Sequence, residues 1–260
     1  MRSEDVIKST EITGVVPFSE LETERLQAMV EAGAEVLNIH RLLSKTGANV
    51  VGELLKTEPK FYEWNHYPKG DVFDRETHGQ YYYHAHVAAQ RFEGEHGHFH
   101  TFLRPGGMPE GVSPAKLPGV TLPEDISTHL SHLISISMDP RGAPFRLFTV
   151  NRWVTGEVWH RAADVITLLD LFEIDHTWPS WPVNRWVSAM IPLFRPQIVA
   201  LIEARDRTIE GWVAEGDGSD AAYEEVFEDR NREITSYLDI DLEQQVASIQ
   251  NELERRDAAT

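Results

Sequence analysis

Cysteine is absent from this chain of 260 residues, which excludes disulfides, thiolate metal ligands and a cysteine nucleophile. Any metal ion would therefore be bound mainly through nitrogen and oxygen. Long apolar runs are also absent, because no window approaches the roughly 20 apolar residues that a membrane-spanning helix needs. The N-terminal sequence MRSEDVIKSTEITG has no apolar signal region, and together with the lack of cysteine this predicts a cytoplasmic protein without a membrane partner.

Positive charge is scarce, since 24 Lys and Arg residues stand against 42 Asp and Glu residues and give a net charge of −18. Most of such a surface would repel phosphate groups, so nucleic acid is not an expected partner. Three common motifs are missing as well: the chain has no P-loop, no Gly-X-Ser-X-Gly elbow and no His-Glu-X-X-His helix. The sequence therefore does not support assignment as a P-loop nucleotide-binding protein, a serine hydrolase or a zincin metalloprotease.

The N-terminal part, about 19–57, is predicted to be helical. Ser19 is a candidate N-cap with Glu22 three residues later, and apolar residues then recur at helical spacing. Gly33 falls on that apolar stripe, where the missing side chain predicts a close approach by another element.

Residues of about 61–160 are predicted to form the sheet core. After a turn-rich, aromatic stretch, four short segments are rich in β-branched and aromatic residues: QYYYHAHV, GHFHTFLR, HLISISMD and PFRLFTVNRWV. A turn at Asp139-Pro140-Arg141-Gly142 separates the last two segments. This pattern indicates an antiparallel sheet of four or more strands.

The C-terminal part, about 160–256, is predicted to consist of helices, with one interrupted near Pro192 and Pro196. Its many acidic residues indicate a solvated helical surface. The expected fold class is therefore α+β, in one domain spanning 1–260: an antiparallel sheet carrying a histidine cluster, flanked by N- and C-terminal helices. Homodimer formation through the tryptophan-rich and C-terminal helical surfaces is a further expectation.

The histidine cluster is the one stretch that indicates chemistry. Five of the twelve histidines lie between Tyr81 and Phe102, spaced two apart in two groups, so each group would project from one face of a strand. Antiparallel pairing of His86 opposite His98 would put His84 opposite His100. Four imidazoles on one patch of sheet could hold one metal ion, whereas a slip of one residue would separate the two groups.

We therefore predict a divalent transition metal, iron, manganese, copper or zinc, bound by three or four of His84, His86, His98 and His100. Glu95 is a candidate general base or a hydrogen-bond partner of a metal-binding histidine. Glu95 and His96 are also alternative metal ligands. Tyr82 should share the histidine face. Further histidines flank the neighbouring strands and could complete the site: His129, His132 and His160.

Two arginines, Arg104 and Arg152, adjoin aromatic segments of this acidic chain and are candidates to clamp an anionic substrate. Internal ion pairs or stacking on tryptophan are the alternative roles for them. Arg185 lies in a similar setting.

Four segments, WNHYPKGDVFDRETHGQYYYHAH, GEHGHFHTFLR, HLISISMD and NRWVTGEVWHRAADVI, together resemble an uncharacterised family of bacterial proteins, a domain of unknown function. The resemblance implies that the chain from about Leu21 to the C-terminal helices belongs together in one domain. It assigns no activity and no catalytic residue.

The residues themselves favour a metal-dependent enzyme with a histidine-ligated centre that acts on a small, anionic substrate. Hydrolysis and oxidation both remain open. The alternatives are a non-catalytic metal-, haem- or ligand-binding protein and a metal-free interaction module.

Overall fold

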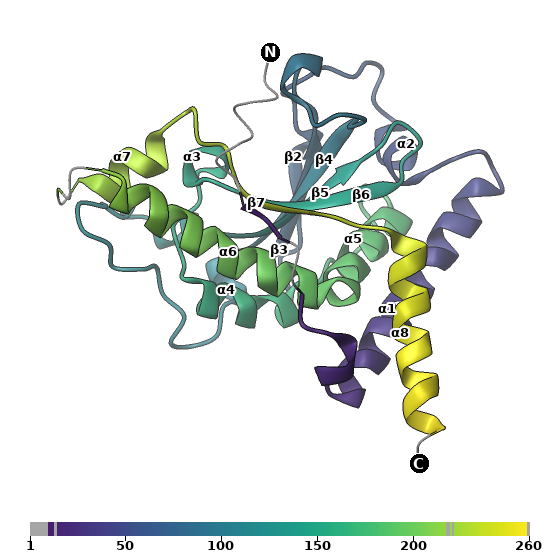
Figure 1. The fold of residues 1–260 in the computed structure, drawn as a ribbon. Coiled ribbons are helices and arrows are strands. Elements are labelled where there is room, and N and C mark those ends of the chain that lie inside the picture. The colour runs from purple at the N-terminus through teal and green to yellow at the C-terminus, as the bar shows by residue number, and fades with distance from the viewer. Residues whose placement is uncertain (1–9, 13–14, 217–218, 220, 259–260) are drawn as a thin grey trace.

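A seven-stranded sheet forms the centre of the computed structural model, which describes residues 10–12, 15–216, 219 and 221–258 (Figure 1). The strand order is β1-β7-β6-β5-β4-β3-β2. All neighbours pair antiparallel except β1 and β7, which are parallel. The strands are β1 (Thr10–Glu11), β2 (Tyr67–Phe73), β3 (Gly79–His84), β4 (Gly97–Leu103), β5 (Ser131–Met138), β6 (Pro144–Val150) and β7 (Ile234–Asp239).

Helices precede and follow the predicted sheet segments, which confirms the α+β class. They are α1 (Thr23–Ser44), α2 (Val50–Leu55), α3 (Arg152–Thr155), α4 (Ala162–Leu168), α5 (Trp181–Leu193), α6 (Arg195–Ala214), α7 (Ala222–Glu228) and α8 (Leu242–Asp257). The predicted interruption is present, because α5 ends at Leu193 and α6 begins at Arg195, with Pro196 in its first turn.

Aromatic and apolar side chains of the sheet face the helices. The Tyr81 hydroxyl of β3 donates to Asn184 Oδ1 of α5 at 2.6 Å, and the Phe99 ring of β4 lies 5.5 Å from the Trp186 ring. In Figure 1, α5 and α6 lie on the same side of the sheet, and α6 packs against β6 and β7. Because successive side chains alternate between faces, the even-numbered residues of β3 and β4 project from the opposite face.

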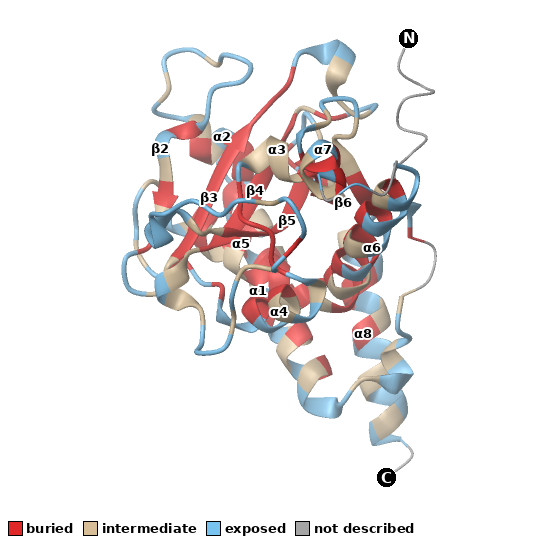
Figure 2. Cartoon of the chain, turned by 90° about the vertical axis from the view of Figure 1, so that its left-hand side faces the viewer, coloured by how far each residue is buried: buried red, intermediate tan, exposed pale blue. Residues whose placement is uncertain are grey.

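The apolar core lies between the sheet and the helices, and Figure 2 shows the buried strands and the buried sides of the helices around it. Helix α1 contributes a stripe at helical spacing that includes Leu26, Met29, Val36 and Ile39. Each fully buried side chain of this kind contributes about 1.5–3 kcal/mol. A Cβ on Gly33 would lie 2.8 Å from the Val246 side chain of α8, which confirms the predicted close approach.

Strand β7 corrects the prediction that the C-terminal part is helical throughout. Its segment ITSYLD lacks an apolar alternation because hydroxyl groups fill the buried positions. Thr149 Oγ1 of β6 lies 2.7 Å from Thr235 Oγ1 and 2.6 Å from Ser236 Oγ, and the Ser236 hydroxyl donates to the Leu201 carbonyl. A strand stabilised by paired hydroxyls carries no hydrophobic periodicity from which it could be predicted.

Strand β2 was likewise predicted as a turn-rich segment. Its register jumps between Tyr67, which pairs with Tyr83, and Val72, which pairs with Tyr81. The turn-forming residues Pro68-Lys69-Gly70-Asp71 lie inside this irregularity, and Gly70 and Asp71 have positive φ. Turn residues within a bulged edge strand are indistinguishable in sequence from those of a loop.

Gly97→Ala should destabilise the protein by about 1–3 kcal/mol, because a Cβ there would overlap the His84 carbonyl oxygen and lie 2.6 Å from the Tyr83 hydroxyl oxygen. Urea unfolding measures this change. Gly211→Ala in α6, where a Cβ meets nothing within 4 Å, is the control and should be neutral or stabilising by up to about 1 kcal/mol. Equal stability of both variants would show that β4 has room to move away from β3.

Candidate metal centre

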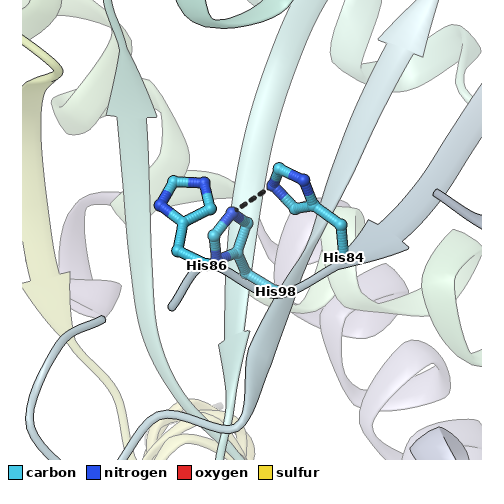
Figure 3. A group of neighbouring side chains, drawn as sticks. All are labelled: His84, His86 and His98. Carbon is cyan, nitrogen blue, oxygen red and sulfur yellow. Dashed lines mark hydrogen bonds between the residues drawn. The ribbon is translucent and has the colours of Figure 1, made fainter. Parts of the chain in front are cut away.

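His84, His86 and His98 converge on one buried point on the face of the sheet opposite the helices. One ring nitrogen from each lies within 4.8 Å of those of the other two. The shortest contact joins His84 Nε2 to His98 Nε2 at 2.7 Å (Figure 3). His84 ends β3, His98 lies in β4, and His86 follows β3 in the connecting segment. The predicted histidine cluster is therefore present.

The strand register differs from the prediction by two residues. His84, not His86, lies opposite His98, and His100 lies opposite Tyr82. A shift of two preserves the face of every side chain, so the shared site survives. The connection of residues 85–96 is too long for turn geometry to fix the register. It is set instead by packing such as that of Tyr83 against Phe99 on the helix-covered face.

Carboxylates hold the outer nitrogens of two of these imidazoles. Glu95 Oε1 lies 3.1 Å from His98 Nδ1 and also accepts from the Ser137 hydroxyl at 2.7 Å. Glu233 Oε1 lies 3.4 Å from His86 Nδ1. When Nδ1–H donates to a carboxylate, Nε2 keeps its lone pair, and this arrangement is the usual one around metal-ligating histidines. The carboxylates thus prepare His86 and His98 to bind a metal through Nε2.

The three histidines fit a metal ion with a small adjustment. In the neutral pair, His98 Nε2 is the acceptor, so His84 Nε2–H donates to it. Two nitrogens bound to one tetrahedral metal lie about 3.3 Å apart, so the rings of His84 and His98 would separate by about half an ångström. The His84 proton would move to Nδ1 or to solvent.

His100 lies next to this triad. Its ring centre is 5.1 Å from that of His84 and 4.9 Å from that of His98. Its Nδ1 contacts Ser135 Oγ at 2.9 Å and His132 Nε2 at 3.2 Å, whereas its buried Nε2 has no hydrogen-bond partner within the protein. His100 is therefore positioned beside the triad with its Nε2 free.

Burial favours the neutral form of His84, His100 and His132, and the neutral form of an imidazole is the one that binds a metal. Burial lowers the pKa of His84 far below its ordinary value, and the charges of His98, His86 and His66 lower it further. Burial likewise lowers the pKa of His100, and that of His132 to about 3. Burial alone would raise the pKa of Glu95, but the His98 charge and three hydrogen bonds outweigh it and lower the pKa.

The other histidines named from the sequence occupy different environments. His96 Nδ1 lies 2.6 Å from the Tyr83 hydroxyl, toward the helix-covered face, and His129 Nε2 donates to the Pro123 carbonyl. His132 contacts His100. His160 is buried, and its Nδ1 has no hydrogen-bond partner within the protein.

Both predicted substrate-clamping arginines contact protein groups. Arg104 Nε donates to Gln80 Oε1 at 2.6 Å, and its guanidinium lies 4.8 Å from the centre of the Phe73 ring. Arg152 Nη2 donates to Glu224 at 2.8 Å and to Glu228 at 2.7 Å. Arg185 pairs with Glu35. A substrate-binding role for Arg104 and Arg152 stays a prediction.

Sequence reasoning missed several groups at the site. Glu233 belongs to a segment that was expected to be a solvated helical surface. Trp64 stacks on His86 at 4.3 Å between ring centres, and His66 stacks on Tyr82 at 3.6 Å. Tyr82 itself shares the histidine face, as predicted. Trp64 has φ of 70° and is 52% exposed. A positive φ at a bulky residue such as Trp64 often marks a functional site, and it can be recognised only in a structure.

Together, the fold and the site define an α+β protein whose antiparallel sheet carries a buried histidine cluster able to bind a metal ion. A family model for a domain of unknown function, DUF6969, matches residues 30–240, and the chain belongs to that family. This confirms the resemblance inferred from the sequence. No curated protein and no solved structure matches the chain.

One membrane-related finding concerns α5 and α6. Within the described residues, no single helix is long and apolar enough to cross a membrane, and α5 with α6 meets that requirement only as a pair bent by 74°.

The metal-free protein should lose stability between pH 7 and pH 5. Histidines protonate in the unfolded chain near pH 6.5, whereas folded His132 and His160 do so only near pH 3 and pH 4. These two histidines outweigh Glu157, which burial makes easier to protonate in the folded state, so the unfolded state binds more protons across this window. Each such histidine costs about 2 kcal/mol by pH 5. Urea unfolding at several pH values measures the slope, which His132→Gln should reduce.

His129→Gln is the matched control, because this partly exposed side chain retains contact with solvent. It should leave the pH slope unchanged. A slope that is the same in wild type and His132→Gln would contradict the assignment of His132 as a neutral buried group.

Proposed function

We propose that this protein is a metal-dependent enzyme with a histidine-ligated centre. His84, His86 and His98 would hold a divalent transition metal, and His100 stands beside them as a fourth ligand or a hydrogen-bonding group. The observation that carries the proposal is the convergence of three buried imidazoles, two of which have carboxylates on their outer nitrogens. Such a metal supplies Lewis-acid or redox chemistry toward a bound substrate.

The ligand set favours a site with room for a substrate. Catalytic zinc sites have three protein ligands, three histidines being one such set, and keep one position open, whereas structural zinc sites are closed by four protein ligands. A small molecule carrying an anionic group is the substrate class that suits three neutral ligands and a dication. Zinc, iron, manganese and copper all accept imidazole nitrogen.

Wild-type protein purified without a histidine tag should contain a near-stoichiometric transition metal, measured by elemental analysis. Alanine at His84, His86 or His98 should abolish it while circular dichroism stays unchanged, because two imidazoles bind too weakly to retain the metal through purification. The double variant His98→Ala/His100→Ala should also lack it. His129→Ala should retain full metal content, and metal content unchanged in every triad variant would refute the site.

Glu95→Gln should weaken metal binding about 10- to 100-fold, because the amide orients His98 without the negative charge that makes its Nε2 a better donor. Competition against a chelator of known affinity measures the change. Glu228→Gln, which removes a carboxylate paired with Arg152, is the matched control. If both variants bind the metal as tightly as wild type, Glu95 only packs against His98.

A second candidate function is non-catalytic metal binding, which the burial of all four imidazoles favours: none is more than 6% exposed. If His100 Nε2 completes the coordination, the site is closed. Cobalt-substituted protein distinguishes the two functions through its visible spectrum. A spectral change on adding azide indicates an open position and supports an enzyme, whereas an unchanged spectrum supports a structural metal.

A further inference from the structure

Buried polar groups without hydrogen-bond partners recur between the histidine pocket, that is, the buried surroundings of His84, His86, His98 and His100, and the segment that follows α3. Across the described residues, eight buried side-chain nitrogen or oxygen atoms have no hydrogen-bond partner within the protein, and five of them lie in the middle of β4, at the start of β5 or in the segment 155–160. They belong to His100, Ser131, Thr155, Glu157 and His160. Native proteins contain few such atoms, and each one needs an explanation.

Glu157 is the most costly member of this group because it carries a charge. Helix α3 ends at Thr155, and Gly156 follows it with a φ of 65°, which turns the chain before the buried Glu157. Glu157 is 2% exposed. Its Oε2 accepts from the His132 backbone N–H at 2.7 Å, and its Oε1 has no partner with full hydrogen-bond geometry. The Thr155 hydroxyl, which also has no such partner, is near enough to stabilise the carboxylate weakly. Oε2 is thus fixed by the backbone, whereas Oε1 is held only loosely.

No ion pair between Glu157 and a lysine or arginine occurs in the described part of the chain. Arg205 of α6 is the nearest buried cation, but its guanidinium donates to the His160 carbonyl at 2.6 Å and to Asp206 at 2.8 Å, and it lies 4.0 Å from the centre of the Trp159 ring. The common structural role of a buried glutamate, that of a salt-bridge partner, is therefore filled by Asp206 and not by Glu157.

The carboxylate is connected to the histidines through His132, whose backbone N–H it accepts from. Its negative charge also contributes to the raised pKa of the Tyr82 hydroxyl, after burial and Asp71. The Tyr82 ring is 5.0 Å from the His100 ring and 5.4 Å from the His84 ring. His132, whose backbone holds Glu157, contacts His100 through its side chain. Glu157 therefore borders the same pocket as the triad.

The surroundings allow this carboxyl group to change its protonation state inside the fold. Burial raises the pKa of Glu157 to about 7, while Asp206 adds to the increase and Arg205, the His132 N–H bond and the Thr155 hydroxyl oppose it. Thr155, from its own segment, and Tyr82, from β3, are the other titratable or polar side chains beside it. A carboxyl group with such a value is suited to proton transfer near neutral pH.

We infer that Glu157 is the proton-accepting residue of the histidine pocket, taking a proton onto its Oε1 from a water molecule or a substrate bound beside Tyr82. The donor's O–H or N–H bond breaks as the carboxylic acid O–H forms, the donor keeps the electron pair, and the acid returns the proton later. No oxidant or reductant is needed. A substrate as the proton donor rests on the proposed function. Proton exchange between Glu157 and a water molecule does not depend on it.

The first test is carbon-13 NMR of the metal-free protein with labelled glutamate carboxyl groups. One carboxyl resonance should titrate near pH 7, well above the others, and Glu157→Gln should remove it. Glu224→Gln, which removes a carboxylate paired with Arg152, is the matched control and should leave that resonance in place. If no glutamate titrates near neutral pH, the inference is wrong. If Glu157→Gln does not fold, Glu157→Asp replaces it, and loss of the glutamate resonance assigns it equally.

The second test asks whether this proton is coupled to the pocket. In cobalt-substituted protein the visible spectrum should change with a midpoint near pH 7, and Glu157→Gln should abolish that change while Glu224→Gln retains it. A spectral titration identical in all three proteins would show that Glu157 is uncoupled and would overturn the inference.

If cobalt does not bind, the proposed function is refuted, but the inference about Glu157 can still be tested. The ring resonances of Tyr82 in the metal-free protein then report the protonation of Glu157. They should shift with a midpoint near pH 7 in wild type and not in Glu157→Gln. Their insensitivity to pH in wild type would overturn the inference.

Discussion

The histidine pocket depends on the pairing of β3 with β4, which sets His84 opposite His98. Buried imidazoles are costly unless both ring nitrogens have partners. Partners for all but His100 Nε2 come from several directions: Glu95, itself held by Ser137 of β5, from the loop before β4, Ser135 from β5, and Glu233 from the residue before β7. Strands far apart in sequence thus provide the environment that keeps a cluster of neutral imidazoles in place.

The sheet has two faces with different chemistry, and the alternation of residues along β3 and β4 produces both. Tyr81, Tyr83 and Phe99 pack into the apolar core, so the strands are held firmly from behind. Side chains on such supported strands keep their geometry better than side chains on loops. His86 is the exception, because it follows the end of β3, where Trp64 covers it. A ligand on a loop gives the site some freedom to adjust as a metal binds.

The polar groups beyond His100 extend this face toward α6. Glu157 accepts from the backbone of His132, whose side chain contacts His100, and buried Arg205 pairs with Asp206 nearby. The segment NRWVTGEVW, which is part of the resemblance to the family, contains the turn at Gly156 that places Glu157 there. This sequence motif therefore has a structural role, because its turn brings a carboxylate to the histidine pocket.

Hydrophobic periodicity predicted α1, the break between α5 and α6, and the four central strands, because each is amphipathic or bounded by proline and glycine. It failed for β2 and β7. Turn residues occupy the bulge of β2, and hydroxyl groups fill the buried side of β7. The spacing of the histidines predicted the shared face but not the register, since a connection as long as 85–96 leaves the pairing to contacts between distant residues.

By itself, the sequence determined the composition of the site: imidazole nitrogen and carboxylate oxygen without thiolate, alternating along strands so that one face is polar and the other apolar. Only the tertiary structure decided which of these groups meet. It chose His84 as the partner of His98, brought Glu233 to His86 from the far end of the chain, and left Arg104 and Arg152 in contact with protein groups. The reason is that alternation along a strand is a local property, whereas the partners of a buried polar group are fixed by packing between segments far apart in the chain.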